Sequence, residues 1–187
     1  AAFLQGLGYG ITDISNVLNS VYVTGAAIGT TILNGLNYGV TEIGGVLKNV
    51  FNQTADQAAQ LMATISSDVA AIGGILKDVF TQTAQQVGQL LKDKLSATVD
   101  AISQFLKSAA GFSLAASGAA SLLKAIGFSA SDIKNELTSL YNTAINDIGN
   151  ILSSIGFSSG DISALGGALA SFGQSVADCF SSFFSDC

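Results

Sequence analysis

The sequence predicts an all-α protein made of tandem helical hairpins, each about 29 residues long, that stack as an α-solenoid or a compact superhelix. The first observation is an internal repeat: residues 43–51 read IGGVLKNVF, and the segment returns at 72–80 as IGGILKDVF. The second is the spacing of the apolar residues, which recur at i, i+3, i+4 and i+7 and so line one face of a helix. Units that bury an apolar face only against their neighbours are typical of solenoids.

The repeat recurs through the chain and divides it into six units. Two helices per unit give about twelve short helices of roughly 10–14 residues, joined by links of about two to four residues. We expect a single repeat domain over residues 1–187. Residues 4–13 match residues 33–42, so the chain starts within the second helix of a unit, which suggests truncation or processing. Each unit begins near an isoleucine, and these isoleucines recur at nearly constant spacing: Ile14, Ile43, Ile72, Ile102, Ile133 and Ile162.

The first helix of each unit is marked by a polar start. A Gly or Ser is followed three residues later by an acidic residue, as in residues 10–13 and 39–42. The pairs Ser129–Asp132 and Ser158–Asp161 resemble capping boxes, in which the hydroxyl accepts from an unpaired amide and the carboxylate lies at the positive end of the helix. These starts place the apolar run of each first helix directly behind its cap.

The second helix of each unit has signals at both ends. It opens with Thr-x-x-Gln, another capping box, at residues 54–57 and 83–86. It closes with an apolar residue, a Gly or Asn, and an aromatic residue, at 7–9, 36–38, 126–128 and 155–157. Gly or Asn adopts the left-handed conformation that ends a helix, and the aromatic residue folds back on the last turn, as in a Schellman cap.

The fourth unit, near residues 101–131, departs from the pattern. Residues 108–123 read SAAGFSLAASGAASLL, a stretch of mostly small side chains without charge. We expect a tightly packed central helix here, because small side chains permit close backbone approach. A small-residue hinge or a glycine-zipper surface is the alternative.

The composition excludes several classes of function. The chain has no His and no Arg, and its seven Lys are outnumbered by 13 acidic residues, for a net charge of −6. An acidic chain without Arg is a poor ligand for phosphates, so a nucleic-acid partner is not expected. Without His, the commonest general base and metal ligand is missing, and scattered carboxylates already explained by capping do not form a catalytic set. The sequence therefore predicts a non-enzyme with no catalytic residue, no metal site and no cofactor.

Glycine pairs inside the predicted helices are the candidate ligand-binding residues. They are Gly44 and Gly45, Gly73 and Gly74, and Gly166 and Gly167. A helical glycine costs about 1 kcal/mol relative to alanine, so a close approach should offset it. At 100° per residue Gly45 lies nearly opposite Ile43, on the expected polar face. Either the next helix layer or a ligand on a smooth, uncharged glycine strip would approach there.

Two other repeated features have a structural interpretation. Lys48, Lys77 and Lys107 recur at one repeat position and predict a solvated basic ridge, with weak anion or lipid-headgroup contact as the alternative. The aromatic residues at the helix ends predict core and cap packing; only those left exposed would stack a ligand.

The chain also carries marks of secretion. Cys179 and Cys187 suggest a disulfide that would staple a C-terminal cap over residues 174–187, with a covalent link to another chain as the alternative. Asn52 opens a glycosylation sequon, Asn-Gln-Thr, that also agrees with an extracellular protein. Residues 14–41 carry no charge but contain many Ser, Thr and Asn side chains, so a stable membrane span is not expected, and membrane contact stays an open alternative.

Taken together, these features predict a secreted helical-repeat protein that binds a lipid or another hydrophobic small molecule in an apolar groove or cavity. The hydrophobic content of 49% and the glycines on the outer face motivate this hypothesis. The alternative is a structural, adhesive or protein-interaction module that packs on copies of itself or on a partner. A third hypothesis is a membrane-active protein with amphipathic hairpins.

Overall fold

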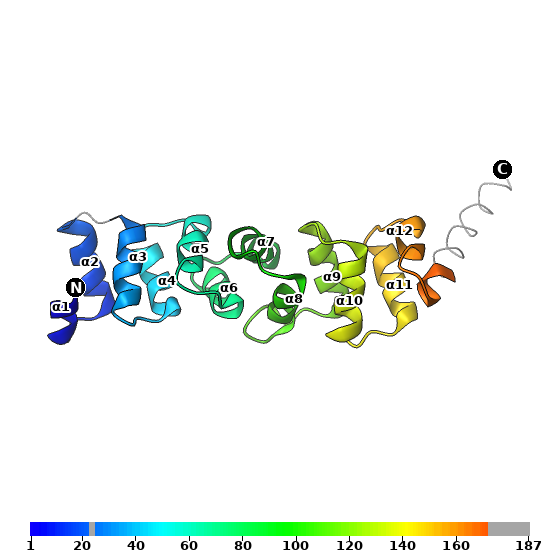
Figure 1. The fold of residues 1–187 in the computed structure, drawn as a ribbon, viewed down its shortest axis with the longest axis horizontal. Coiled ribbons are helices and arrows are strands. Elements are labelled where there is room, and N and C mark those ends of the chain that lie inside the picture. The colour runs from blue at the N-terminus through cyan, green and yellow to red at the C-terminus, as the bar shows by residue number, and fades with distance from the viewer. Residues whose placement is uncertain (23–24, 172–187) are drawn as a thin grey trace.

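The computed structural model describes residues 1–22 and 25–171, and in these residues the chain is all-α without a strand. The helices bounded within this part of the chain follow one another along a rod, with α1 and α12 at opposite ends (Figure 1). The predicted helical-repeat fold is therefore confirmed. In chain order the helices are α1 (Ala2–Gly6), α2 (Ile11–Ser20), α3 (Ala26–Gly35), α4 (Val40–Asn49), α5 (Ala55–Ala63), α6 (Val69–Asp78), α7 (Ala84–Leu95), α8 (Val99–Lys107), α9 (Ala116–Ala125), α10 (Ala130–Ser139), α11 (Ile145–Ser154) and α12 (Ser159–Ser163).

The helices form two layers, the even-numbered helices in one and the odd-numbered helices in the other. Helix α4, for example, contacts α3 and α5 in the opposite layer and α2 and α6 in its own. The same pattern continues to α10, which packs on α9, α11 and α8. Because each helix contacts only its near neighbours along the chain, the architecture is that of a solenoid.

The predicted capping boxes are present. The Gln57 amide donates to Thr54 Oγ1 at 3.3 Å, and the Thr54 amide donates to Gln57 Oε1 at 3.0 Å. The same reciprocal pair starts α7, α10 and α12. Each box satisfies two amides that an isolated helix start leaves unpaired.

The predicted helix stops are also confirmed. Gly8, Asn37, Gly127 and Gly156 have φ values of +86°, +62°, +85° and +86°. The aromatic residue that follows each of them donates its amide to a carbonyl in the last turn, as Phe128 does to Leu123 at 3.0 Å. This is the Schellman geometry, and it turns the chain back toward the opposite layer.

The core is a continuous apolar seam between the two layers. The six isoleucines that mark the repeat are its anchors, since each is at most 1% exposed. Burying one such side chain stabilises the fold by about 1.5–3 kcal/mol. The isoleucine period is thus the period at which the chain returns to the seam.

Three predictions about the elements, on link length, helix length and the central helix, are wrong in detail. The connections range from three residues, at 96–98, to eight, at 108–115, and α1 and α12 have only five residues each. The central helix expected over 108–123 begins only at Ala116, and residues 108–115 form a loop. In that loop a Cβ on Gly111 would lie 1.8 Å from the Phe105 carbonyl oxygen, so the loop presses on α8 where only glycine fits. The Phe112 ring packs edge-on against Phe105 with centroids 5.9 Å apart.

Candidate functional site

The glycine pairs predicted to bind a ligand have two different environments. Gly44 and Gly73 are buried and receive a side chain from the next helix of their own layer. A Cβ on Gly44 would lie 2.6 Å from Ile75 Cγ2, and one on Gly73 would lie 2.8 Å from Phe105 Cζ. The close approach is therefore made by the protein's own next unit, and it falls on the first glycine of each pair rather than the second.

The remaining candidate glycines face open space. A Cβ on Gly45 or Gly74 would meet no atom within 4 Å. Gly74 borders an open depression of about 240 Å³, between α4 and α6. The expected helical position of Gly166 and Gly167 is wrong, because both follow α12 with φ values of +70° and +59°. Ligand binding at these glycines remains a prediction.

In the described part of the chain, six helix C-termini are capped by a side chain from two helices earlier in the same layer. In each case the side chain donates to the carbonyl oxygen of the residue that caps the later helix; Lys92 Nζ lies 2.6 Å from Ile126 O and Lys124 Nζ 2.7 Å from Ile155 O. A cation at this end is favoured by the helix dipole and by unpaired carbonyls. The donor and acceptor pairs are Gln5 and Leu36, Asn19 and Val50, Lys48 and Val79, Lys92 and Ile126, Lys107 and Leu140, and Lys124 and Ile155.

The lysines of this series also lie over aromatic rings. Nζ of Lys48, Lys92, Lys107 and Lys124 lies 4.5–5.8 Å from the centroid of the ring that follows the accepting carbonyl. Such cation–π contacts add to the charge–carbonyl hydrogen bond. We call the combination of lysine, cap carbonyl and ring the lysine cap. Lys77 makes a variant of it on the loop after α8, donating to the carbonyls of residues 110 and 111 and lying over the ring at residue 112.

The lysine caps add to the prediction of a solvated basic ridge. Lys48 and Lys107 are exposed and Lys77 is partly exposed, and each of these lysines also joins its unit to the next one through a hydrogen bond. The sequence carried a signal for this, because an aromatic residue follows each of Lys48, Lys92 and Lys124 slightly more than one repeat later, at the end of a later helix. That signal becomes meaningful only when the superhelical stacking is known.

The N-terminal end of the rod carries acceptors of the same kind but no donor from a described side chain. Leu7 and Val21 are the C-cap residues of α1 and α2, and Tyr9 and Tyr22 supply the rings that follow. These four side chains and Phe3 are each more than half exposed. We call this set (Phe3, Leu7, Tyr9, Val21 and Tyr22) the N-terminal face.

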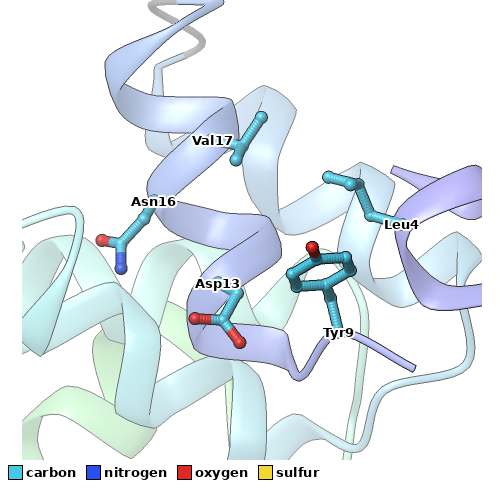
Figure 2. Close-up of a pocket in the computed structure, with 5 residues that line it drawn as sticks. All are labelled: Leu4, Tyr9, Asp13, Asn16 and Val17. Atoms are coloured by element: carbon cyan, nitrogen blue, oxygen red, sulfur yellow. The ribbon is translucent and has the colours of Figure 1, made fainter. Parts of the chain in front are cut away.

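A depression of about 390 Å³ lies beside this face, lined by Leu4, Tyr9, Asp13, Asn16 and Val17. Figure 2 shows the Tyr9 ring between Leu4 of α1 and the side chains of α2, with Asp13 next to the ring and Asn16 on the far side of the helix. The lining is mostly apolar, with one carboxylate and one amide. A small apolar molecule with a polar end would find both kinds of contact here.

Two further depressions lie on the flanks of the rod. One, of about 450 Å³, lies between α6 and α8 and includes Asp68, Gln104 and Phe105. The other, of about 310 Å³, lies between α3 and α5 and includes Gln57 and Leu61. Both open to solvent, so a molecule bound in either would keep much of its surface in water.

A buried polar cluster lies where α8 packs on α10. Glu136 is 5% exposed and is the one charged side chain buried among the described residues. Glu136 Oε2, Ser103 Oγ and the Tyr141 hydroxyl have no hydrogen-bond partner. Burial raises the pKa of Glu136, the charge of Asp100 raises it further, and the nearby Ser103 hydroxyl lowers it by less. Burial, followed by the charge of Glu136, raises the pKa of Tyr141 to about 12.

Of the remaining predicted site residues, Asn52 lies in the described part of the chain and the two cysteines do not. Cys179, Cys187 and the C-terminal cap at 174–187 lie outside the described residues. Asn52 is exposed in the link between α4 and α5, with a left-handed φ of +52°. Thr54 of the same sequon is the N-cap of α5.

Within the described residues no helix is both long enough and apolar enough to cross a bilayer. The uncharged stretch 14–41 is divided among α2, α3 and the start of α4. The same part of the chain holds no group of three or more acidic or Cys side chains close enough to bind a metal ion.

Comparisons with known proteins add no family or relative. No protein-family model matches the chain, and searches of curated proteins and of solved structures give no significant match.

Proposed function

We propose that this chain is a non-catalytic helical-repeat protein that works by packing against other protein chains. The observation that supports this proposal best is the N-terminal face, where large apolar side chains of α1, α2 and the links after them gather on the described surface. Scattered exposed apolar residues are ordinary, but a group of them on one surface is typical of an interaction site. Among the described residues, six of the seven exposed large apolar residues lie within or beside the first three helices: Phe3, Leu7, Tyr9, Val21, Tyr22 and Ile28.

The shape of the rod supports a protein partner over a small molecule. Sites for small hydrophobic ligands usually bury most of the ligand in a concave, enclosed space. The four depressions described above are open, and those on the flanks lie in the grooves between successive helices. Stacked repeats also provide the extended surfaces that solenoids use to bind proteins.

Binding of a lipid or another hydrophobic small molecule is the second candidate. The depression beside Tyr9 favours it, because its volume of about 390 Å³ suits a small ligand and Leu4, Tyr9 and Val17 supply an apolar lining. Ligand binding there and protein binding at the N-terminal face would compete, since Tyr9 belongs to both.

The proposal includes no catalytic role. The chain lacks His and Arg, which removes the commonest general base and the best clamp for an anion. The two acids with raised pKa values, Glu136 and Tyr141, are packed between repeat helices, and neither lines one of the four depressions. Secretion, with a disulfide between Cys179 and Cys187, remains part of the proposal.

Native mass spectrometry of protein from its natural source tests the two candidates together. Complexes with a second protein chain, or oligomers that grow with concentration, are expected. A monomer that carries a reproducible small-molecule adduct, lost on denaturation, would contradict the proposal and support the carrier. Comparing intact masses before and after reduction tests the disulfide in the same samples.

A further inference from the structure

We infer that the contact between α8 and α10 is an acid-tightened joint, in which the two helices stay packed while the Glu136 carboxyl is protonated and separate when it ionises. The joint lies inside the rod, so it goes beyond the proposed interaction with other chains and does not depend on it. Its basis is the way neighbouring helices of the even-numbered layer pack, together with the charges around Glu136.

Helices of the even-numbered layer pack through one pair of repeat positions. The residue directly after the isoleucine of a unit, which we call the small position, receives the residue three places after the isoleucine of the next unit, which we call the filling position. Gly44 receives Ile75 in this way and Gly73 receives Phe105, with distances of 2.6 and 2.8 Å from an added Cβ to the nearest side-chain carbon atom. An apolar side chain closes both of these contacts.

The same pair of positions between α8 and α10 is polar. The small position is Ser103 and the filling position is Glu136. Ser103 has no exposed surface and Glu136 is 5% exposed, yet neither Ser103 Oγ nor Glu136 Oε2 has a hydrogen-bond partner. An ionisable group therefore takes the place that isoleucine and phenylalanine fill in the two units before it.

The charges that act on Glu136 are negative. They come from Asp100 in the first turn of α8 and from Asp132 in the first turn of α10. Tyr141, the third unpartnered group of the cluster, stays neutral because its own pKa is raised to about 12. No described lysine forms an ion pair with Glu136.

The lysines around the joint are held elsewhere. Lys107 of α8, Lys124 of α9 and Lys134 of α10 each donate to a backbone carbonyl at the end of a later helix. The charged residue of α11 is Asp147, in the first turn, so this helix adds no cation. Among the described residues, therefore, no cation is left to neutralise a carboxylate at the joint.

Ionising Glu136 in the closed joint would leave an unpaired charge out of water. Such a charge is costly, and a protein avoids it by keeping the group protonated or by letting water reach it. Burial and the two aspartates raise the pKa of Glu136, and the Ser103 hydroxyl lowers it by less. The joint is therefore tight at acid pH and weakens as pH rises from the ordinary glutamate pKa through the raised one.

Opening stays at this place because the units of a repeat array contact only their neighbours, so each interface contributes separately to stability. The filling positions of the other described units are Val46, Ile75, Phe105 and Leu165, and none of these side chains titrates. The contact between α8 and α10 is thus the one in the described rod whose filling residue responds to pH.

Thiol labelling at the small position tests the joint in the full-length chain. Ser103→Cys, with Cys179→Ser and Cys187→Ser so that one thiol reacts, is labelled with 4,4′-dithiodipyridine from about pH 4, near the ordinary glutamate pKa, to about pH 8. Ser15→Cys in the same background is the matched control, because Ser15 is a small position with no exposed surface and its filling position, Val46, is apolar. The ratio of the two labelling rates removes the effect of pH on thiol reactivity. It is expected to rise with pH by up to about tenfold per pH unit, because opening releases one proton.

Three variants make the labelling test specific. Glu136→Gln in the Ser103→Cys chain should make the ratio independent of pH. Asp100→Asn should make the total rise smaller, because the closed joint tolerates a carboxylate better without that negative charge. Asp93→Asn, which changes an exposed acid of α7, should leave the rise as it is.

A pair of spin labels covers the case in which a thiol in place of Ser103 disturbs the joint. Labels on Gln104→Cys and Asn135→Cys, in the same background, sit at exposed positions of α8 and α10 and leave Ser103 and Glu136 in place. Double electron–electron resonance is expected to show a second, longer distance whose share grows with pH. The longer distance should be absent when Glu136→Gln is added.

Three results would overturn the inference. A labelling ratio that stays constant with pH would mean that α8 and α10 remain packed or that the whole rod loosens together. A rise that persists in Glu136→Gln would assign the response to another group. A single spin-label distance at every pH would show that the two helices do not separate.

Discussion

Two adjacent glycines in one helix are expected to respond to the same substitution with opposite signs. Gly44 and Gly45 both lie in the interior of α4, so replacement by alanine brings each the same gain in helix propensity, about 0.5–1 kcal/mol. At Gly45 nothing lies within 4 Å of the new methyl group. Gly45→Ala should therefore stabilise the protein by about that amount.

At Gly44 the same methyl group would meet a filled site. It would lie 2.6 Å from Ile75 Cγ2 and 3.3 Å from Met62 Sδ. Ile75 is 2% exposed and β-branched, so its methyl group cannot rotate away without strain. Overpacking of this kind costs about 1–3 kcal/mol. After the helix-propensity gain, Gly44→Ala should destabilise the fold by roughly 1–2 kcal/mol.

Thermal unfolding followed by circular dichroism at 222 nm measures the difference. For a chain of this size each kcal/mol shifts the Tm by about 2–4 °C, so the two variants should differ by roughly 5–10 °C. Repeat arrays can lose cooperativity, so the order of the two Tm values is a firmer observable than a free energy from either. The pair Gly73→Ala and Gly74→Ala should repeat the contrast. If Gly44→Ala raised the Tm as much as Gly45→Ala, the packing of α4 against α6 described above would be wrong.

Three more outcomes follow from the structure. Lys124→Gln removes the cation over Phe157 and should destabilise the fold by about 1–2 kcal/mol in urea unfolding, whereas Lys94→Gln, which breaks an exposed ion pair with Asp56, should cost less than about 1 kcal/mol. Because the pKa of Glu136 is higher in the folded than in the unfolded state, the free energy of unfolding should fall as pH rises from the ordinary glutamate pKa through the raised one. Glu136→Gln should remove this dependence and stabilise the protein at pH 7. If the variant kept the pH profile of the natural chain, the burial of Glu136 would be contradicted. Gly111→Ala should cost more than about 3 kcal/mol in the same urea assay, since its Cβ would collide with the Phe105 carbonyl; a loss below about 1 kcal/mol would mean that the 108–115 loop does not press on α8.

The features that the sequence predicted well are local. Capping boxes, Schellman stops and apolar spacing involve residues within about two turns of one another, and their chemistry does not depend on the rest of the fold. The isoleucine period predicted both the number of units and the residues that anchor the core. The loop at 108–115 was missed because small residues are compatible with a helix, and only the contact of Gly111 with α8 decides against one.

The N-terminal face could be predicted only in part. The aromatic residues at helix ends were recognised, but the sequence gives Tyr9 and Phe128 the same local pattern. Their exposure differs because α7 covers one and no described helix covers the other. The hydrogen bonds of the lysine caps were missed for the same reason: each donor meets its carbonyl 31 to 34 residues along the chain.

By itself, therefore, the sequence determined the elements of this protein: short capped helices, a regular hairpin period, one buried isoleucine per period and the absence of His and Arg. The tertiary structure decided which of two adjacent glycines receives a neighbour, which lysines lie over rings, and which of the described apolar side chains stay exposed. The physical reason is the range of the interactions. Caps and helical faces form between residues a few positions apart. The packing of a side chain against Gly44 or Gly73, the lysine caps and the exposure of apolar residues depend instead on how one unit is rotated and translated relative to the next.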